Sequence, residues 1–161
     1  MFNSIINCNF AAVMNKIEKY KLLCEHIKSL TQGETDEVAK MANIAAAIHL
    51  EFGFWWTGFY RVKGGELVLV PFQGPVACMH IPFGKGVCGT AWKQAETIVV
   101  PDVDLFPGHI ACSSESRSEI VVPVLNADGE IVAVLDIDSK DLATFDETDK
   151  EWLEEIVKVM K

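Results

Sequence analysis

The sequence predicts a single α+β domain: an antiparallel sheet of about six strands, with helices from both ends of the chain on one face and a loop-built pocket on the other. Three observations lead to this prediction. The chain has 161 residues, half of them hydrophobic, which is enough to bury one core. Apolar residues recur at helical spacing near both ends, whereas the middle holds short runs that favour strands. Two connections between these runs are hairpin turns, which require antiparallel neighbours.

Two helices are expected before the sheet. From residue 12 to residue 30, apolar side chains recur every three or four positions, with lysine and glutamate on the other face. Cys24 lies on this apolar stripe, so we expect it to be a small buried hydrophobe. A second helix should begin near Thr35 or Asp36, because acids suit its first turn, and Gly53 should end it.

The following segment is predicted to form strands. Their expected ranges are 54–62, 67–70, 76–81, 97–100, 119–125 and 131–137, with hairpin turns at 63–66 and 126–129. A glycine-rich loop at 82–89 should lead into a short helix at 90–94, and 101–118 should be a long structured loop with one helical turn. An amphipathic helix from about Asp146 closes the domain.

Composition excludes several classes of partner. A net charge of −9 argues against binding to nucleic acid or to an anionic membrane surface. No apolar run approaches the ~20 residues that cross a bilayer, and the N-terminus lacks the features of a secretory signal. Five cysteines without an export signal suit a reducing cytoplasm, where cysteines on loops serve catalysis, redox sensing or metal binding more often than structure.

Three of the five cysteines, Cys78, Cys88 and Cys112, lie beside or inside turn-rich segments. They are ten and twenty-four positions apart, which is not the spacing of a C-x-x-C redox motif, so any meeting must be tertiary. Our hypothesis is that they form one redox centre. The alternative from residue types is that each is an isolated buried thiol.

A metal site is a second alternative. The candidate donors are Cys78, His80, Cys88, His109 and Cys112, whose spacing matches no compact ligand pattern. Within a strand at 76–81, Cys78 and His80 would point to the same face. The N-terminus of the short helix would lower the pKa of Cys88 if the thiol lay beside it.

Carboxylates suggest a second element of the site. Asp136 and Asp138 share one face of their strand, and pairing about the 126–129 turn places Glu119 near one of them. Such a cluster could hold an ammonium group and supply a proton. The alternative is a solvated end of a hairpin.

The aromatic strand offers a third element. Trp56 and Tyr60 fall on the same face and could wall a small apolar pocket, although core packing is the more common role for such residues. The loop at 84–89 is rich in glycine but does not match a phosphate-binding motif, so we interpret it as a close-packed loop.

Several motifs together resemble one family. They are I-P-F-G-K-G-V-C-G-T (81–90), F-P-G-H-I-A-C (106–112), S-R-S-E-I-V-V-P (116–123), V-L-D-I-D-S (134–139), W-T-G-F-Y (56–60) and P-F-Q-G-P-V-A-C (71–78). Over about residues 30 to 160 the chain is similar to the free methionine-(R)-sulfoxide reductases, small enzymes built on a GAF domain. These motifs are more specific than the GAF fold, most of whose members are sensors.

The resemblance implies a thiol mechanism. Cys112 would attack the sulfoxide sulfur of free methionine-(R)-sulfoxide and become a sulfenic acid, and methionine would leave. Cys78 or Cys88 would then condense with it to a disulfide, which thioredoxin or a similar dithiol would reduce. Cys78 is the leading candidate, since the strand predicted at 76–81 would direct it toward the pocket.

The resemblance also implies how the substrate is held. Glu119, Asp136 and Asp138 would bind its ammonium group, and one of them would share a proton with the sulfoxide oxygen. Trp56 and Tyr60 would enclose the S-methyl group, and backbone amides of residues 110–118 would bind the carboxylate. No metal and no cofactor are expected.

Residues 1–13 have no counterpart in the family, so we expect them to form a frayed N-terminal extension ahead of a catalytic domain at 14–161. GAF domains often pair through their terminal helices, so a homodimer is expected. The alternative function is a non-catalytic GAF module that binds a small molecule or senses redox state. It would bind a ligand or form a disulfide without turnover.

Overall fold

The computed structural model describes residues 14–110 and 112–161. Its elements, in chain order, are α1 (Lys16–Thr31), α2 (Glu37–Phe52), β1 (Trp56–Lys63), β2 (Glu66–Gln73), β3 (His80–Pro82), α3 (Gly86–Gln94), β4 (Ile98–Val100), the 3-10 turn η1 (Val103–Leu105), β5 (Ser118–Leu125), β6 (Ile131–Ser139), α4 (Glu147–Val157) and the 3-10 turn η2 (Lys158–Met160). The extension predicted for residues 1–13, with Cys8, lies outside the described residues. None of the described helices is long and apolar enough to cross a membrane.

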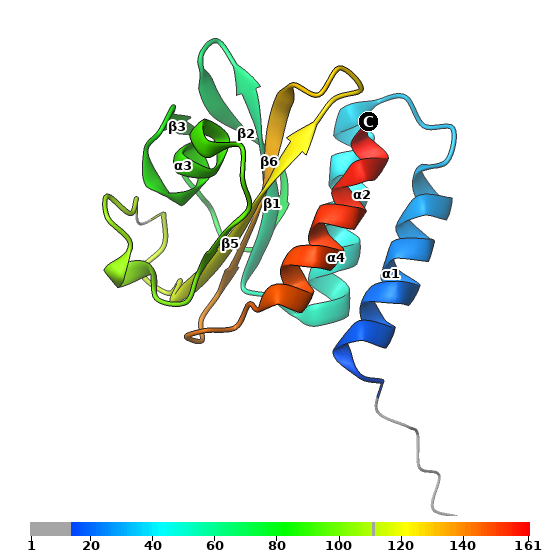
Figure 1. Ribbon diagram of the computed structural model, residues 1–161, viewed down its shortest axis with the longest axis horizontal. Coiled ribbons are helices and arrows are strands. Elements are labelled where there is room, and N and C mark those ends of the chain that lie inside the picture. The colour runs from blue at the N-terminus through cyan, green and yellow to red at the C-terminus, as the bar shows by residue number, and fades with distance from the viewer. Residues whose placement is uncertain (1–13, 111) are drawn as a thin grey trace, which may run out of the picture.

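One six-stranded sheet forms the centre of the molecule, in the order β3-β2-β1-β6-β5-β4. Every neighbouring pair is antiparallel. The hairpins β1–β2 and β5–β6 meet where β1 pairs with β6, so both predicted turns are present. Figure 1 shows α1, α2 and α4 on one side of the sheet and α3 with the long loops on the other. The predicted α+β class, with helices and loops on opposite faces, is confirmed.

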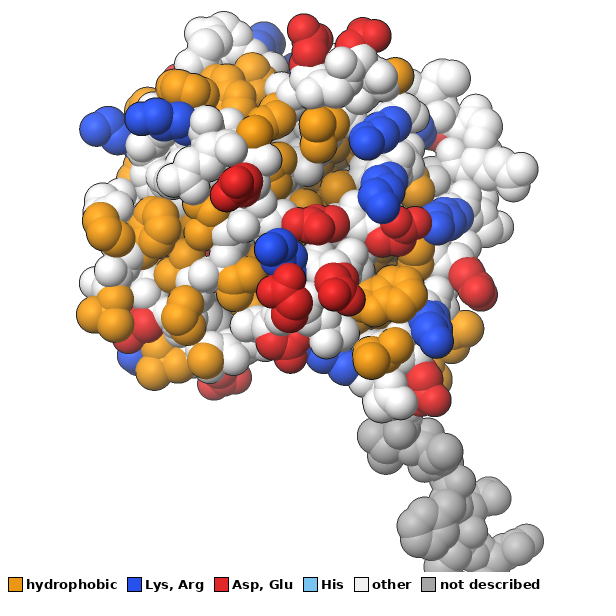
Figure 2. Space-filling view, in the orientation of Figure 1, with side chains coloured by type: hydrophobic (Ala, Val, Ile, Leu, Met, Phe, Trp, Pro, Cys, Tyr) orange, Lys and Arg blue, Asp and Glu red, His pale blue; other side chains and the backbone are white. Residues whose placement is uncertain are grey.

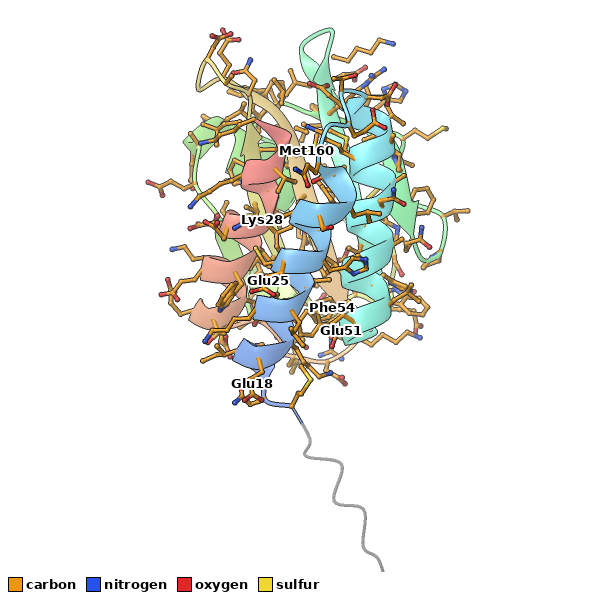
Figure 3. All side chains as sticks on the ribbon, turned by 90° about the vertical axis from the view of Figure 1, so that its right-hand side faces the viewer. Glu18, Glu25, Lys28, Glu51, Phe54 and Met160 are labelled. Atoms are coloured by element: carbon orange, nitrogen blue, oxygen red, sulfur yellow. A yellow bond between two sulfur atoms is a disulfide. The ribbon has the colours of Figure 1, made fainter. Side chains whose placement is uncertain are left out.

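The helical face holds the larger core. Alternate residues of the central strands, including Phe59, Ile120, Leu135 and Ile137, are fully buried against α2 and α4. Burial of each such side chain contributes roughly 1.5–3 kcal/mol. Figure 3 shows α1 lying in front of α2 and α4, so it closes this layer from outside. The same alternation directs the intervening residues of β1, β5 and β6 to the opposite face.

The helix ends follow from local sequence. Asn15, Asp36 and Asp146 each accept hydrogen bonds from backbone N–H groups at the starts of α1, α2 and α4, which satisfies donors that the helices leave free. Gly53 ends α2 with a φ of 67°, a left-handed conformation that glycine adopts without strain. The predicted starts of α2 and α4, and the predicted end of α2, are confirmed.

A buried carboxylate joins the first and last helices. Asp149, in the first turn of α4, is fully buried and accepts a hydrogen bond from the hydroxyl of Tyr20 at 2.7 Å. It also forms an ion pair with Lys16 and accepts from the backbone N–H of Asp146 at 2.8 Å. A buried charge is tolerated only when it is paired and hydrogen-bonded, and Asp149 meets both conditions.

The strand predicted at 76–81 is mostly wrong, because only His80–Pro82 pair with β2. The segment ahead of it bends over the opposite face of the sheet. Pro75 has no N–H to donate to a neighbouring strand. Its carbonyl oxygen accepts a hydrogen bond of 3.0 Å from the indole N–H of Trp56. Cys78 therefore lies on a loop, whereas the His80 side chain is exposed and bonds to Glu66 at 2.9 Å.

The short helix begins at Gly86, four residues earlier than predicted. A Cβ atom at Gly89 would lie 2.5 Å from the carbonyl oxygen of Pro82, so glycine allows the helix to pack against the turn before it. Cys88 consequently lies within the first turn of α3 rather than on a loop. In Figure 2, apolar side chains gather on the left of the view, over the region of α3 and the long loop, and charged side chains are frequent in the middle and on the right, over the helices.

Candidate active site

A pocket lies on the face of the sheet that α3 and the loops cover. Its cavity volume is about 40 Å³, so the pocket is narrow. Its walls come from β1, β5, β6, α3, the 75–77 segment and the loop that precedes β5. The predicted site residues among its lining are Trp56, Tyr60, Cys88, Cys112, Glu119, Asp136 and Asp138. The structure thus brings together side chains that are up to 82 positions apart, from Trp56 to Asp138.

Cys78 and Cys112 form a disulfide at the edge of this pocket, with their Cα atoms 5.4 Å apart. Both residues are half-buried, and each lies on a loop. The hydroxyl of Tyr60 donates to the carbonyl oxygen of Cys78 at 2.9 Å, which fixes one cysteine to the pocket wall. Two of the three predicted thiols therefore meet, whereas the redox-centre hypothesis joined all three.

The acid cluster arises from the register of one hairpin. Glu119 pairs with Asp138, and Val121 pairs with Asp136, on the face of the β5–β6 hairpin opposite the helices. Glu119 and Asp136 are buried, whereas Asp138 is half-buried. The three carboxylates line one pocket, so the predicted cluster is present and is not a solvated hairpin end.

Burial governs the charges of these acids. Burial, together with the negative charges of Asp136 and Asp138, raises the pKa of Glu119 well above its usual value. Burial and the charge of Asp138 do the same to the pKa of Asp136. Burial raises the pKa of Asp138 to about 6, while a hydrogen bond from Ser116 lowers it. Among the described residues, no lysine or arginine lines the pocket, and its one basic side chain is the imidazole of His109.

Cys88 occupies the floor of the pocket and is free. Its thiol donates toward Oε1 of Glu119, with the sulfur and oxygen 4.0 Å apart. Burial and the charges of Asp136 and Glu119 raise the pKa of Cys88 well above its usual value. The expectation that the helix N-terminus would lower this pKa is wrong, because desolvation and neighbouring carboxylates outweigh a helix dipole.

Two aromatic residues form the apolar wall. The ring centroids of Trp56 and Tyr60 lie 5.9 Å apart, and Phe72 stacks against Trp56 with centroids 5.3 Å apart. Gly58, between them on β1, leaves room for this arrangement, because a Cβ atom there would lie 2.6 Å from the ring of Trp56. Trp56 and Tyr60 therefore share the pocket face, as predicted from strand alternation.

Other lining residues carried no clear signal in the sequence. His109 lies with its Nε2 3.7 Å from Oε2 of Glu119, and burial lowers its pKa. Trp55 lines the pocket as well, and the ammonium of Lys140 sits 3.5 Å from the centre of its ring. The sequence identifies His109 only as a candidate metal donor. Its position in a loop without periodicity gave no indication that it would face Glu119.

The metal-donor set considered from the sequence does not assemble. Cys78 and Cys112 are bonded to each other, and His80 is exposed beside Glu66. Among the described residues, the donors that come together are Cys88, Glu119 and Asp136, whose ligand atoms all lie within 4.8 Å of one another.

The fold and the pocket define a GAF domain. The GAF domain model matches residues 34–160. "GAF domain-containing protein A" of Dictyostelium discoideum is 52% identical to the chain, over 91% of this chain and 92% of that protein. The free methionine-R-sulfoxide reductase of Saccharomyces cerevisiae is 42% identical, over 99% of this chain and 93% of that protein.

A solved structure supports the same assignment as the family model and the relatives. The free methionine-R-sulfoxide reductase of Neisseria meningitidis, in complex with its substrate, superposes with a TM-score of 0.89 at 53% identity, over 92% of this chain and 90% of that one. The chain therefore belongs to the GAF domain family and, within it, to the free methionine-R-sulfoxide reductases.

Proposed function

We propose that this protein reduces free methionine-(R)-sulfoxide to methionine, with Cys112 as the attacking thiol. The observation that carries the proposal is the meeting of a Cys78–Cys112 disulfide and a cluster of buried acids at one pocket. Family membership supports the same reaction. Two relatives that match 99% and 89% of this chain are free methionine-R-sulfoxide reductases. A non-catalytic sensor would not need a disulfide pair, an acid cluster and an apolar wall together.

The first step uses the thiol and one acid. The sulfur of Cys112 attacks the sulfoxide sulfur while a buried carboxylic acid, Glu119 or Asp136, protonates the sulfoxide oxygen. The sulfur–oxygen bond breaks, methionine leaves, and Cys112 holds the oxygen as a sulfenic acid. The raised pKa values of both acids support this role, because burial favours the protonated form of each.

The second step forms the disulfide. The thiol of Cys78 attacks the sulfenic sulfur, and the oxygen leaves as water. The geometry supports Cys78 as the resolving thiol, because its Cα lies 5.4 Å from that of Cys112, whereas Cys88 remains a free thiol on the pocket floor. A dithiol then reduces the disulfide and restores both thiols.

Recognition of a free amino acid follows from the same residues. A cluster of three acids with no lysine or arginine among the described lining residues suits a substrate ammonium group, which a methionine residue inside a peptide lacks. Trp56 and Tyr60 form an apolar wall for the S-methyl group. Backbone amides of the 110–118 segment would bind the carboxylate.

The assay that tests the proposal compares free and peptide-bound sulfoxides of both configurations with dithiothreitol as reductant. Turnover is expected only for the free R epimer, and Cys112→Ser should abolish it. Cys24→Ser is the matched control, because Cys24 is buried in α1 on the far side of the sheet. Unchanged turnover in Cys112→Ser would exclude the role given to Cys112.

We also propose thioredoxin, or a similar dithiol protein in a reducing cytoplasm, as the electron donor. Apolar side chains beside the disulfide support this, because Val76 and Met79 flank Cys78 and are 88% and 68% exposed. Met79 does not line the pocket, so Met79→Asp should slow turnover with thioredoxin and leave turnover with dithiothreitol unchanged. Equal slowing with both reductants would argue against docking at this rim.

A homodimer through the terminal helices is the assembly that we propose. Exposed apolar side chains on the helical face support it, notably Ile17 and Leu22 on α1 and Leu50 on α2. Sedimentation equilibrium should give twice the mass of one chain. Leu22→Glu should return the protein to a monomer, and a monomeric wild-type protein would rule out this assembly.

A further inference from the structure

Three metal-binding atoms converge on the pocket floor. The thiol of Cys88 comes from α3, the carboxylate of Glu119 from β5 and that of Asp136 from β6. Their ligand atoms all lie within 4.8 Å of one another, and all three residues are buried. Since each donor comes from a different element of a packed core, the group is held in place by the fold.

A second observation indicates that this group can accept a further ligand. Oδ1 of Asp136 has no hydrogen-bond partner, although the residue is only 7% exposed and lines the pocket. An unpartnered buried carboxylate oxygen costs free energy unless a proton or a cation compensates it.

We propose that Cys88, Glu119 and Asp136 bind one thiophilic divalent cation, for which Zn²⁺ is the best match. Zinc takes thiolate sulfur at about 2.3 Å and carboxylate oxygen at about 2.0–2.2 Å, commonly with three protein ligands and one open position. The three atoms lie within 4.8 Å of one another and must move inward to reach such distances. The thiolate selects Zn²⁺ over Mg²⁺ and Ca²⁺, which prefer sites made only of oxygen ligands.

The chemistry of binding is an exchange of protons for metal. The thiol and the carboxylic acids lose their protons, and the cation takes their lone pairs. A fourth ligand is available from water or from His109, whose Nε2 lies 3.7 Å from Oε2 of Glu119. Because the Cys78–Cys112 disulfide leaves Cys88 free, the site persists in the oxidised protein.

A bound cation would compete with the amino-acid substrate for the pocket. A cation at Glu119 and Asp136 occupies the region proposed for the substrate ammonium group. Zn²⁺ would therefore inhibit the reductase when it is bound, rather than serve as its cofactor.

Cobalt(II) tests the site directly, because its bond to a thiolate gives a near-ultraviolet charge-transfer band. The full-length protein is first oxidised, so that Cys78 and Cys112 cannot supply a thiolate. Titration with Co²⁺ should produce this band at one equivalent, and Zn²⁺ should displace it. Cys88→Ser should abolish the band, whereas Cys24→Ser and Cys8→Ser should retain it. Absence of the band in the wild type, or its persistence in Cys88→Ser, would overturn the proposal.

A second measurement does not depend on the serine variant. Asp136→Asn keeps the thiolate and removes one charged ligand, so the Kd for Zn²⁺ should rise about tenfold or more. Zn²⁺ should raise the Tm of the wild type, and equal concentrations of Mg²⁺ should not. An equal shift with Mg²⁺, or an unchanged Kd in Asp136→Asn, would contradict the site. None of these readouts requires turnover, so they are independent of the reductase activity.

Discussion

The hydroxyl of Tyr60 donates a hydrogen bond of 2.9 Å to the backbone carbonyl of Cys78. Tyr60 is almost fully buried on β1, whereas Cys78 lies on a loop that does not pair with the sheet. This bond therefore ties the loop of one redox cysteine to the rigid wall of the pocket. The same side chain contributes its ring to the apolar wall, so Tyr60 joins the recognition of substrate to the position of the disulfide.

Tyr60→Phe separates these two roles, because it keeps the ring and removes the donor. Loss of a hydrogen bond of about 1 kcal/mol should slow disulfide formation about fivefold. Methionine release in a single turnover should be little changed, and the Cys112 sulfenic acid should persist longer. Rapid quenching with a sulfenic-acid trap measures this lifetime. An unchanged lifetime in Tyr60→Phe would show that the bond does not position Cys78.

Gly58→Ala tests the packing of the aromatic wall. The added Cβ would lie 2.4 Å from Cβ of Phe72 and 2.6 Å from the ring of Trp56, so both side chains must move. We expect the KM for free methionine-(R)-sulfoxide to rise about tenfold, equivalent to about 1.4 kcal/mol of lost binding. In a Trp56→Ala background the same glycine substitution should cost less, because the ring it displaces is absent. If the effects of Gly58→Ala and Trp56→Ala on KM were additive, the substitution at Gly58 would not act through the ring of Trp56.

Much of this arrangement is predictable from the sequence because it is local. The turn at 126–129 fixes the register of the β5–β6 hairpin, and strand alternation then assigns Glu119, Asp136 and Asp138 to one face. Alternation likewise places Trp56 and Tyr60 together. The alternation of apolar residues along the same strands predicts the core against the helices.

What could not be predicted depends on contacts between distant segments. The residues around Cys78 have the composition of a strand, but the carbonyl groups of Pro75 and Cys78 bond to side chains of β1, so the segment leaves the sheet. The pKa of Cys88 depends on how deeply α3 is buried beside Glu119, which no local pattern reveals. His109 faces the same acid from an irregular loop.

Asp138 should make stability depend on pH. Burial raises its pKa to about 6 from the usual 3.8, so the folded protein holds this proton more tightly than the unfolded chain does. Its contribution to stability is complete below about pH 4 and is lost as the pH rises through about 6. The difference corresponds to up to about 3 kcal/mol.

Asp138→Asn cannot ionise, so its free energy of unfolding should vary less between pH 4 and pH 7 than that of the wild type. Urea denaturation across this range measures the difference. Asp128→Asn, in the exposed hairpin turn, is the control for loss of a negative charge. Parallel pH profiles for Asp138→Asn and the wild type would show that Asp138 does not titrate in this way.

Asp149 should contribute to stability without affecting catalysis. Asp149→Ala leaves the hydroxyl of Tyr20 and the backbone N–H of Asp146 without an acceptor, and it removes the ion pair of Lys16. We expect a loss of about 3 kcal/mol in the free energy of unfolding, against about 1 kcal/mol for Tyr20→Phe. The kcat should be unchanged, because this network joins α1 to α4 on the face opposite the pocket. A loss below that of Tyr20→Phe would contradict the role given to the buried carboxylate.

A single turnover followed by mass spectrometry tests the central claim most directly. The reduced protein is mixed with one equivalent of free methionine-(R)-sulfoxide in the absence of reductant, and the remaining thiols are alkylated. The predicted result is one equivalent of methionine, a Cys78–Cys112 disulfide, and Cys88 recovered as an alkylated thiol. Formation of methionine with Cys112 still alkylated, or formation of the disulfide without methionine, would contradict it.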